Sequence, residues 1–294
     1  MSPPAGGQVT RPRVDQQLLL RLAGQLTDRD RLLLRLLDEH QVLTTPQITD
    51  VAFTGHRRCE TRLRQLYLLR AVDRFRPLQA AGSAPFHWVL DQAGTAVLTA
   101  EHGGPSTGDR SGPLTSRTRR RAGSLALASN PHLSHLVGSN GMFTGLLKAA
   151  RGQPDCCLDR WWSAQRCAAE WGEVVRPDGY GRWRQRGAEV EFLLEYDQGT
   201  ERLHRLAGKL PGYAELLAAA GEPTPVLFVF LRAAREAEAR RVLVPAARRL
   251  GVPVATSVLT TGVCAADPVW LNTSGGTRRP LIDLAASQVD GEQS

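Results

Sequence analysis

The chain has 294 residues, 42% of them apolar, which is enough for two modest hydrophobic cores and short of three. Its formal net charge is +8, and nearly all of the excess lies in residues 1–125, which contain 18 basic and 11 acidic residues. This part of the chain is therefore the candidate for contact with phosphates. The absence of a run of roughly 18 apolar residues, of an apolar leader and of zinc-type cysteine spacing argues against a membrane protein, a secreted disulfide scaffold and a zinc module.

Two helices are expected near the start of the chain. Residues 1–13 are rich in proline and glycine, and we expect a disordered tail there. Residues 27–40 carry leucines at helical spacing behind Thr27, a candidate N-cap. A second, shorter helix is predicted to begin with Thr45 as its N-cap and Pro46 at its first position.

A third helix, residues 56–69, follows the turn at Thr54-Gly55. Its apolar residues Cys59, Leu63 and Leu66 recur at helical spacing and predict a buried stripe. The polar residues on the remaining faces are the candidate DNA contacts of this helix: His56, Arg57, Arg58, Thr61, Arg64 and Gln65.

The period then changes from helix to strand. Residues 72–78 and 85–90 read as two strands joined by a tip of small residues, which indicates a β-hairpin that carries Arg74 and Arg76. Three helices followed by a hairpin is the order of a winged helix-turn-helix, with the third helix in the major groove and the hairpin as the wing. We therefore expect a DNA-binding domain over residues 14–100. A helical bundle that binds another protein is the alternative.

The rest of the chain reads as a linker, an α/β domain and a tail. Residues 101–124 are rich in glycine, serine and proline and end near three arginines, Arg119, Arg120 and Arg121. Residues 125–273 alternate between helical and strand-like runs and predict a mixed sheet flanked by helices. The predicted helices cover 135–151, 161–171, 201–220 and 235–250, and the predicted strands cover 172–183, 188–197, 224–231 and 252–259. Residues 274–294 would be a C-terminal tail.

Acidic residues accompany two of these strands. Asp178 is predicted to end one strand, and Glu195 and Asp197 to end the next, where their spacing puts both on the same face. Two or three carboxylates at a sheet edge are ligands for Mg²⁺ or Mn²⁺. Lys209, one of only two lysines among 37 basic residues, lies on the following helix and could stabilise charge on a phosphate. Alternatively, each acidic residue simply marks a strand entering a turn.

This arrangement resembles the PD-(D/E)XK nuclease superfamily, in which an Asp ends one strand and a Glu-x-Lys motif ends its neighbour. Pro177-Asp178 matches the first element and Glu195 the second, but Asp197 stands where the lysine is expected. Some members supply that lysine from the following helix, a role that Lys209 could take. The resemblance implies a restriction-endonuclease-like core in which Asp178, Glu195 and Asp197 hold a metal and all three act with Lys209 in catalysis.

Several segments in order are similar to those of the replication-relaxation family of bacterial and plasmid proteins. They include RRCETRLRQLYLLRAVDRFRP, the double tryptophan of RWWSAQRCAAEWG, PDGYGRW and EFLLEYDQGTERLHRLAGKLPGY, within a resemblance that runs from about residue 26 to residue 273. The family implies a role in plasmid or mobile-element replication and DNA relaxation.

The resulting hypothesis is a cytoplasmic, nucleoid-associated protein of mixed α+β and α/β class that binds double-stranded DNA and nicks or cleaves it with Mg²⁺ or Mn²⁺. Its rival is a non-catalytic replication or transcription factor that needs no cofactor and uses the second domain for dimerisation or partner binding. A homodimer and replication proteins are therefore further candidate partners, and no membrane contact is expected.

Overall fold

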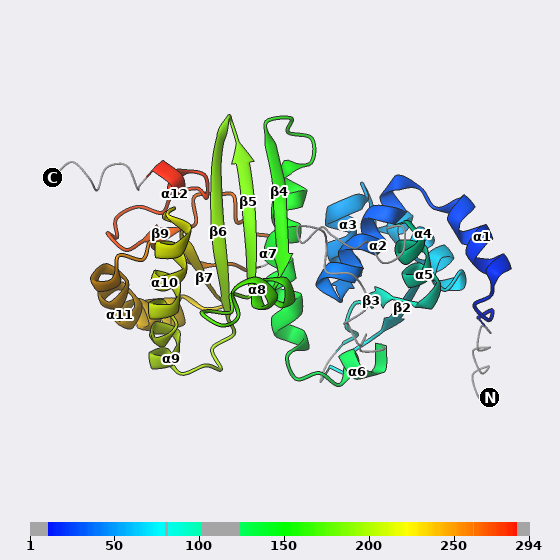
Figure 1. The fold of residues 1–294 in the computed structure, drawn as a ribbon, viewed down its shortest axis with the longest axis horizontal. Coiled ribbons are helices and arrows are strands. Elements are labelled where there is room, and N and C mark those ends of the chain that lie inside the picture. Colours follow the sequence, from blue (N-terminus) through cyan, green and yellow to red (C-terminus); the bar gives the residue numbers. More distant parts are fainter. Residues whose placement is uncertain (1–10, 80–81, 102–123, 261, 287–294) are drawn as a thin grey trace. The chain divides into compact units, whose positions relative to one another are not determined.

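The computed structural model describes residues 11–79, 82–101, 124–260 and 262–286 (Figure 1). The chain divides into two compact units, residues 1–130 (unit 1) and residues 131–294 (unit 2). Parts of the predicted tails, of the hairpin tip and of the linker with its three arginines lie outside the described residues: 1–10, 80–81, 102–123 and 287–294.

Unit 1 combines helices with a small antiparallel sheet. Its elements are α1 (Gln16–Gln25), α2 (Asp28–His40), β1 (Leu43–Thr44), α3 (Thr45–Ala52), α4 (His56–Leu68), β2 (Val72–Phe75), β3 (His87–Leu90), α5 (Gln92–Glu101) and α6 (Ser124–Ala128). The three strands lie in the order β1-β3-β2, and Val72 pairs with Leu90 where β2 and β3 run side by side. The core contains side chains from α1 to α4 and from β3, among them Leu22, Leu33, Ile48, Leu63 and Trp88.

Local hydrogen bonds set where the helices of unit 1 begin. Thr27 is the N-cap of α2, as predicted, and forms a reciprocal capping box with Asp30. The predicted N-cap of α3 is wrong by one residue, because Thr44 caps this helix and Pro46 takes the second helical position. The reason lies in Gln47, three residues after Thr44. The Oε1 atom of Gln47 accepts a hydrogen bond of 2.8 Å from the backbone N–H of Thr44, which completes a capping box.

Unit 2 is built on a six-stranded mixed sheet. Its strands β4 (Cys156–Ser163), β5 (Gly179–Gln185), β6 (Ala188–Asp197), β7 (Val226–Phe230), β8 (Val254–Val258) and β9 (Leu271–Asn272) lie in chain order across the sheet. The pairs β4/β5, β5/β6 and β8/β9 are antiparallel, whereas β6/β7 and β7/β8 are parallel. The carboxyl ends of β6, β7 and β8 therefore share one edge of the sheet.

Helices cover both faces of this sheet. They are α7 (Leu133–Ala150), α8 (Ala164–Trp171), α9 (Leu203–Gly208), α10 (Leu210–Ala220), α11 (Ala233–Leu250) and α12 (Asp283–Ala286). Successive side chains of β6 point to opposite faces of the sheet and so belong to two different cores. Phe192 and Leu194 pack with Phe143 of α7, whereas Leu193 packs with Tyr213 of α10 and with α11. Among the described residues, no helix is both long and apolar enough to cross a bilayer.

The helix predicted over 161–171 is wrong in its first residues. Trp161 and Trp162 lie in strand β4, where they pair with Gly181 and Tyr180. Their side chains serve opposite cores, because Trp161 stacks on Phe143 and Trp162 contacts Tyr180. The helix begins only after Ser163, whose hydroxyl accepts a hydrogen bond from the third residue of α8.

Two further predictions differ from the structure around the acidic residues. Asp178 does not end a strand; it immediately precedes β5, which starts at Gly179. The helix predicted over 201–220 is divided into α9 and α10 at Lys209, and Pro211 occupies the first turn of α10. Proline is tolerated there because the backbone N–H groups of a first helical turn lack intrahelical acceptors.

Candidate functional site

The outer face of α4 is polar and open to solvent. All six side chains selected from the sequence, from His56 to Gln65, are exposed, while Cys59, Leu63 and Leu66 are fully buried. Within the described residues, the guanidinium groups of Arg57, Arg58 and Arg64 have no hydrogen bond or ion pair, so they remain available to a ligand.

Arg62, which lies beside this face, has a structural role that sequence reasoning missed. Its Nη2 and Nε lie 2.6 and 3.0 Å from the two carboxylate oxygens of the buried Asp30 on α2. Arg62 also donates from Nη1 to the side-chain oxygen of Gln65 at 2.8 Å. This arginine therefore fixes α4 to α2.

The two arginines of the predicted wing differ in their surroundings. The guanidinium of Arg74 is half-buried and lies over three rings, 4.8 Å from the centroid of Tyr67, 4.0 Å from that of Phe86 and 5.5 Å from that of Trp88. Arg76 is exposed, lies 3.8 Å over Phe86 and donates to Ser83 Oγ at 3.1 Å. Cation–π contacts thus hold both arginines, and Arg76 is the more accessible to a ligand.

In unit 2, Glu195 lies in a buried acid–base cluster. Its side chain is 2% exposed, one carboxylate oxygen is 2.6 Å from Lys209 Nζ, and the other accepts a hydrogen bond from the hydroxyl of Tyr213. Burial, and then the nearby charge of Asp178, raise the pKa of Glu195 to about 7 despite the Lys209 ammonium and the Tyr213 hydrogen bond. Burial alone would lower the pKa of Lys209, but the charge and hydrogen bond of Glu195, together with the charges of Asp178 and Glu201, outweigh it and raise that pKa.

Asp178 joins this cluster from the loop before β5. One of its carboxylate oxygens accepts from the backbone N–H of Tyr196 at 2.8 Å, and the other lies 2.9 Å from Nε2 of His135 on α7. Burial lowers the pKa of His135, but the hydrogen bond and charge of Asp178 outweigh this effect and raise it. Asp178 therefore couples α7 to the end of β6.

Asp197 has different partners. It is buried and accepts hydrogen bonds from Arg235 Nε at 2.7 Å and from the backbone N–H of Gly199 at 2.8 Å. Among the described residues, no three His, Cys, Asp or Glu side chains are placed to hold a metal ion together. The structure thus brings Asp178, Glu195 and Lys209 together, and it engages Asp197 in a separate ion pair.

Several partners of these acidic residues were not selected from the sequence. Tyr213 follows Lys209 by four residues, a spacing that places both on one side of a helix, so this partner could have been found. His135 is more than 40 residues before Asp178 in the chain, and no local pattern signals their contact. The same holds for Arg235, which reaches Asp197 from α11.

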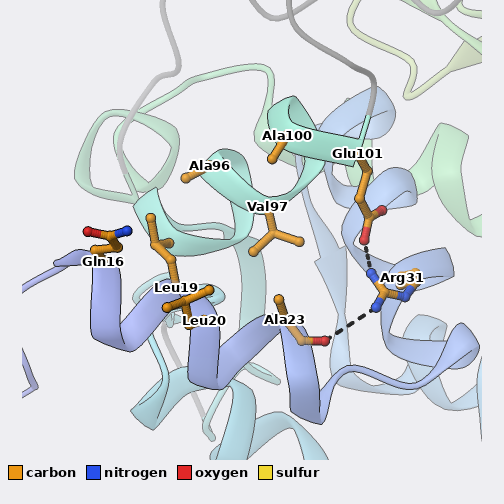
Figure 2. Close-up of a pocket in the computed structure, with 9 residues that line it drawn as sticks. All are labelled: Gln16, Leu19, Leu20, Ala23, Arg31, Ala96, Val97, Ala100 and Glu101. Carbon is orange, nitrogen blue, oxygen red and sulfur yellow. Dashed lines mark hydrogen bonds and ion pairs between the residues drawn. The ribbon is translucent and has the colours of Figure 1, made fainter.

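A cavity of about 360 Å³ lies between α1 and α5 (Figure 2). Figure 2 shows Leu19 and Leu20 of α1 facing Val97 of α5 across it, with Arg31 and Glu101 joined in an ion pair at one end. Because these two charges neutralise each other and most of the remaining lining is aliphatic, this cavity offers little acid–base chemistry.

Comparison with known families identifies a match over much of the chain. The family model described as replication-relaxation matches residues 34–228, from α2 to β7, and therefore includes both α4 and the Glu195 cluster. No curated protein and no solved structure matches the chain significantly. Since the matched residues make up well over half of the sequence, the chain belongs to the replication-relaxation family.

Proposed function

We propose that the chain is a DNA-binding protein that acts in the replication or relaxation of plasmid or mobile-element DNA, in the cytoplasm and in association with the nucleoid. The observation that carries this proposal is the outer face of α4, where the guanidinium groups of Arg57, Arg58 and Arg64 are exposed and have no hydrogen bond or ion pair among the described residues. Arginines free to donate to phosphates and to guanine edges are what a helix needs in the major groove.

The order of elements around α4 supports a winged helix-turn-helix. Helix α2, strand β1, helices α3 and α4 and the hairpin β2–β3 follow one another, and β1 completes a three-stranded sheet beside β3. In this proposal α4 is the recognition helix and the β2–β3 hairpin is the wing, with Arg76 as its accessible cation.

The test compares variants of the full chain in duplex binding. Arg57→Ala with Arg64→Ala removes two contacts, so we expect weaker binding and a log-log salt slope that is lower by about 1.8, at about 0.9 per phosphate contact. Arg21→Ala with Arg35→Ala is the matched control, because these arginines are exposed and belong to other helices, α1 and α2. Equal affinity and slope for the α4 variant and the wild type would reject the assignment.

A second candidate function is phosphodiester cleavage at the Glu195 cluster. It is favoured by the convergence of Asp178, Glu195 and Lys209, the residues expected from the resemblance to PD-(D/E)XK nucleases with a displaced lysine. Asp178 and Glu195 supply two hard oxygen ligands of the kind that Mg²⁺ or Mn²⁺ prefers, and a cation would relieve the repulsion between them. With two carboxylates and not the three expected, water and phosphate oxygens would complete the coordination of such an ion. A bound ion would supply charge neutralisation at the phosphate.

The protein's own groups have distinct parts in this second candidate. The raised pKa of Lys209 keeps its ammonium charged at neutral pH, so it can stabilise negative charge on a phosphate. Tyr213 orients the Glu195 carboxylate, and His135 orients that of Asp178. Asp197 would act on the site only by holding Arg235 and the loop at Gly199.

Supercoiled plasmid incubated with the protein and Mg²⁺ or Mn²⁺ separates cleavage from its rival. We expect nicked or linear product from the wild type and from Glu222→Gln, and none from Asp178→Asn or Lys209→Ala. Glu222 is an exposed carboxylate that precedes β7, so it lies toward the edge of the sheet opposite the end of β6. Binding without product in the wild type would instead favour a non-catalytic factor whose unit 2 serves as a dimerisation surface or as a surface for replication proteins.

A further inference from the structure

Three exposed arginines lie at the carboxyl edge of the unit 2 sheet. Arg202 is the N-cap residue of α9, Arg205 lies within α9, and Arg232 is the N-cap residue of α11. None of their side chains makes a hydrogen bond or an ion pair within the described part of the chain. We call this set the arginine rim.

The chain topology brings the arginine rim to the Glu195 cluster. Asp197 at the end of β6 is in register with Phe230 at the end of β7, so the segments that leave these two parallel strands emerge at the same edge. Arg235 in the first turn of α11 donates a hydrogen bond to the carbonyl of Glu201, the residue before Arg202. The starts of α9 and α11 are therefore in contact.

Lys209 links the rim to the buried cluster. Arg205 precedes it by four residues, or about one helical turn, and the backbone at Lys209 is still right-handed helical. The side chains of Arg205 and Lys209 thus leave α9 on the same side, one toward solvent and the other toward Glu195.

The charges around this edge are unequally compensated. Lys209 is paired with Glu195 at 2.6 Å and with Glu201 at 3.4 Å, and Arg235 is paired with Asp197 at 2.7 Å. Within the described residues, the three rim arginines have no such ion-pair partner, so they are available cations at this edge of the sheet.

We propose that the arginine rim binds the sugar-phosphate backbone of DNA and gives unit 2 a nucleic-acid contact of its own, separate from α4. This inference rests on the proposed function in taking DNA as the ligand. Several separated guanidinium groups suit a polyanion, because each can form two parallel hydrogen bonds with a phosphate. A backbone held there presents its phosphodiester groups next to Lys209.

The experiment measures the salt dependence of duplex binding by the full chain, both in the wild type and in the Arg57→Ala/Arg64→Ala background. Arg205→Ala with Arg232→Ala is the test variant. Arg241→Ala with Arg249→Ala is the control, because both arginines are exposed on α11 and lie about 13 and 25 Å along the helix from Arg232 at 1.5 Å per residue.

In both backgrounds, the log-log salt slope of the test variant should be lower than that of its parent by about 1.8. The factor by which affinity falls between 50 and 200 mM salt should therefore be about twelve times smaller for the test variant than for its parent. The control should match its parent. Backbone amides of residues 202–208 and 232–236 should also gain DNA-dependent protection from hydrogen exchange in the wild type.

The same salt slope in the test and control variants would overturn the proposal that the arginine rim binds DNA. If both slopes match that of the parent, the effect is absent, and if both are lower, the effect is due to net charge alone. The outcome for α4 is separate. If Arg57→Ala/Arg64→Ala binds like the wild type while Arg205→Ala/Arg232→Ala does not, the recognition-helix proposal fails and the rim stands.

Discussion

At the residue scale, the ion pair between Asp30 and Arg62 determines how α4 is held. The Asp30 side chain is 1% exposed, and its carboxylate accepts from Arg62 and from the backbone and hydroxyl of Thr27. Asp30→Ala would leave Arg62 without its buried partner and remove the capping box. We expect the free energy of unfolding to fall by about 3–5 kcal/mol in urea denaturation.

Asp28→Ala is the matched control for this prediction. Asp28 lies in the same first turn of α2 but is exposed, so its loss should cost no more than about 1 kcal/mol through the helix dipole. Equal losses for the two variants would show that the buried ion pair contributes nothing beyond the charge at the start of the helix.

The same ion pair predicts a pH dependence. Burial alone would raise the pKa of Asp30, but hydrogen bonds from Arg62 and Thr27 outweigh it and hold that pKa below its usual value. A depressed carboxyl pKa stabilises the fold above the unfolded value of about 3.9, and this contribution is lost as pH falls through the folded value. Unfolding of the wild type should therefore become easier below pH 4, and Asp30→Ala should lack this part of the acid response.

Residue-scale sequence reasoning works where the information is local. The outward placement of Arg57, Arg58 and Arg64 follows from the helical period alone, and the structure exposes all three. The role of Arg62 could not be predicted, because its partner lies 32 residues earlier and is brought to it only by packing of α2 against α4. The resemblance to nucleases with a displaced lysine connected Lys209 with Glu195, whereas nothing in the sequence connected Asp178 with His135.

At the scale of elements, α5 packs closely on the turn between α4 and β2. A Cβ added to Gly94 would lie 2.2 Å from the backbone oxygen of Ala71 and 2.7 Å from a methyl group of Leu90. Because the backbone cannot give way without moving α5, Gly94→Ala should destabilise the protein by about 1–3 kcal/mol, as overpacking does. Thermal unfolding followed by circular dichroism measures this loss.

Gly24→Ala is the control for Gly94→Ala, since it also replaces a helical glycine of unit 1. A Cβ at Gly24 would meet nothing within 4 Å, and the helix is relieved of a poor helix former. This variant should be more stable than the wild type by about 0.5–1 kcal/mol. A loss of stability in both variants would point to a general intolerance of alanine instead of the contact with Ala71.

Element types could largely be predicted from sequence, and element boundaries less well. The predicted helices over 27–40 and 56–69 correspond to α2 and α4, because long apolar periodicity is unambiguous. The double tryptophan was misassigned because aromatic residues fit both a buried helix and a strand that feeds two cores. Helix α1 was not predicted from the sequence. Strand β1 was not predicted either, since a two-residue strand carries no periodic signal.

At the scale of the whole molecule, the core of unit 2 extends beyond the domain limit expected at residue 273. Leu281 is fully buried and Leu284 is 5% exposed, and both belong to the core cluster that contains Phe192 and Trp270. Composition gave no sign of this, because residues 274–280 are polar and rich in glycine, and the leucines that follow are few. Only the packed sheet provides the surface that these leucines cover.

An ion pair anchors the same segment to α11. The Arg278 Nη2 lies 2.6 Å from a carboxylate oxygen of Glu236, whose side chain is 5% exposed, and Thr256 donates to the other oxygen at 2.7 Å. A short antiparallel bridge between Trp270 and Arg279 brings the chain back toward the sheet. Residues 274–286 are thus held both by charge and by apolar burial.

A chain that ends at Thr273 should therefore be strongly destabilised. Loss of two buried leucines removes about 1.5–3 kcal/mol each, and leaving Glu236 without its cation costs about 3–5 kcal/mol more, which together approach the whole stability of a typical domain at about 5–15 kcal/mol. A chain that ends at Ala286 keeps every one of these contacts and should unfold at a much higher temperature than the chain that ends at Thr273. Calorimetry on both chains tests the prediction, and an unchanged transition in the shorter chain would show that the segment after residue 273 adds no stability to unit 2.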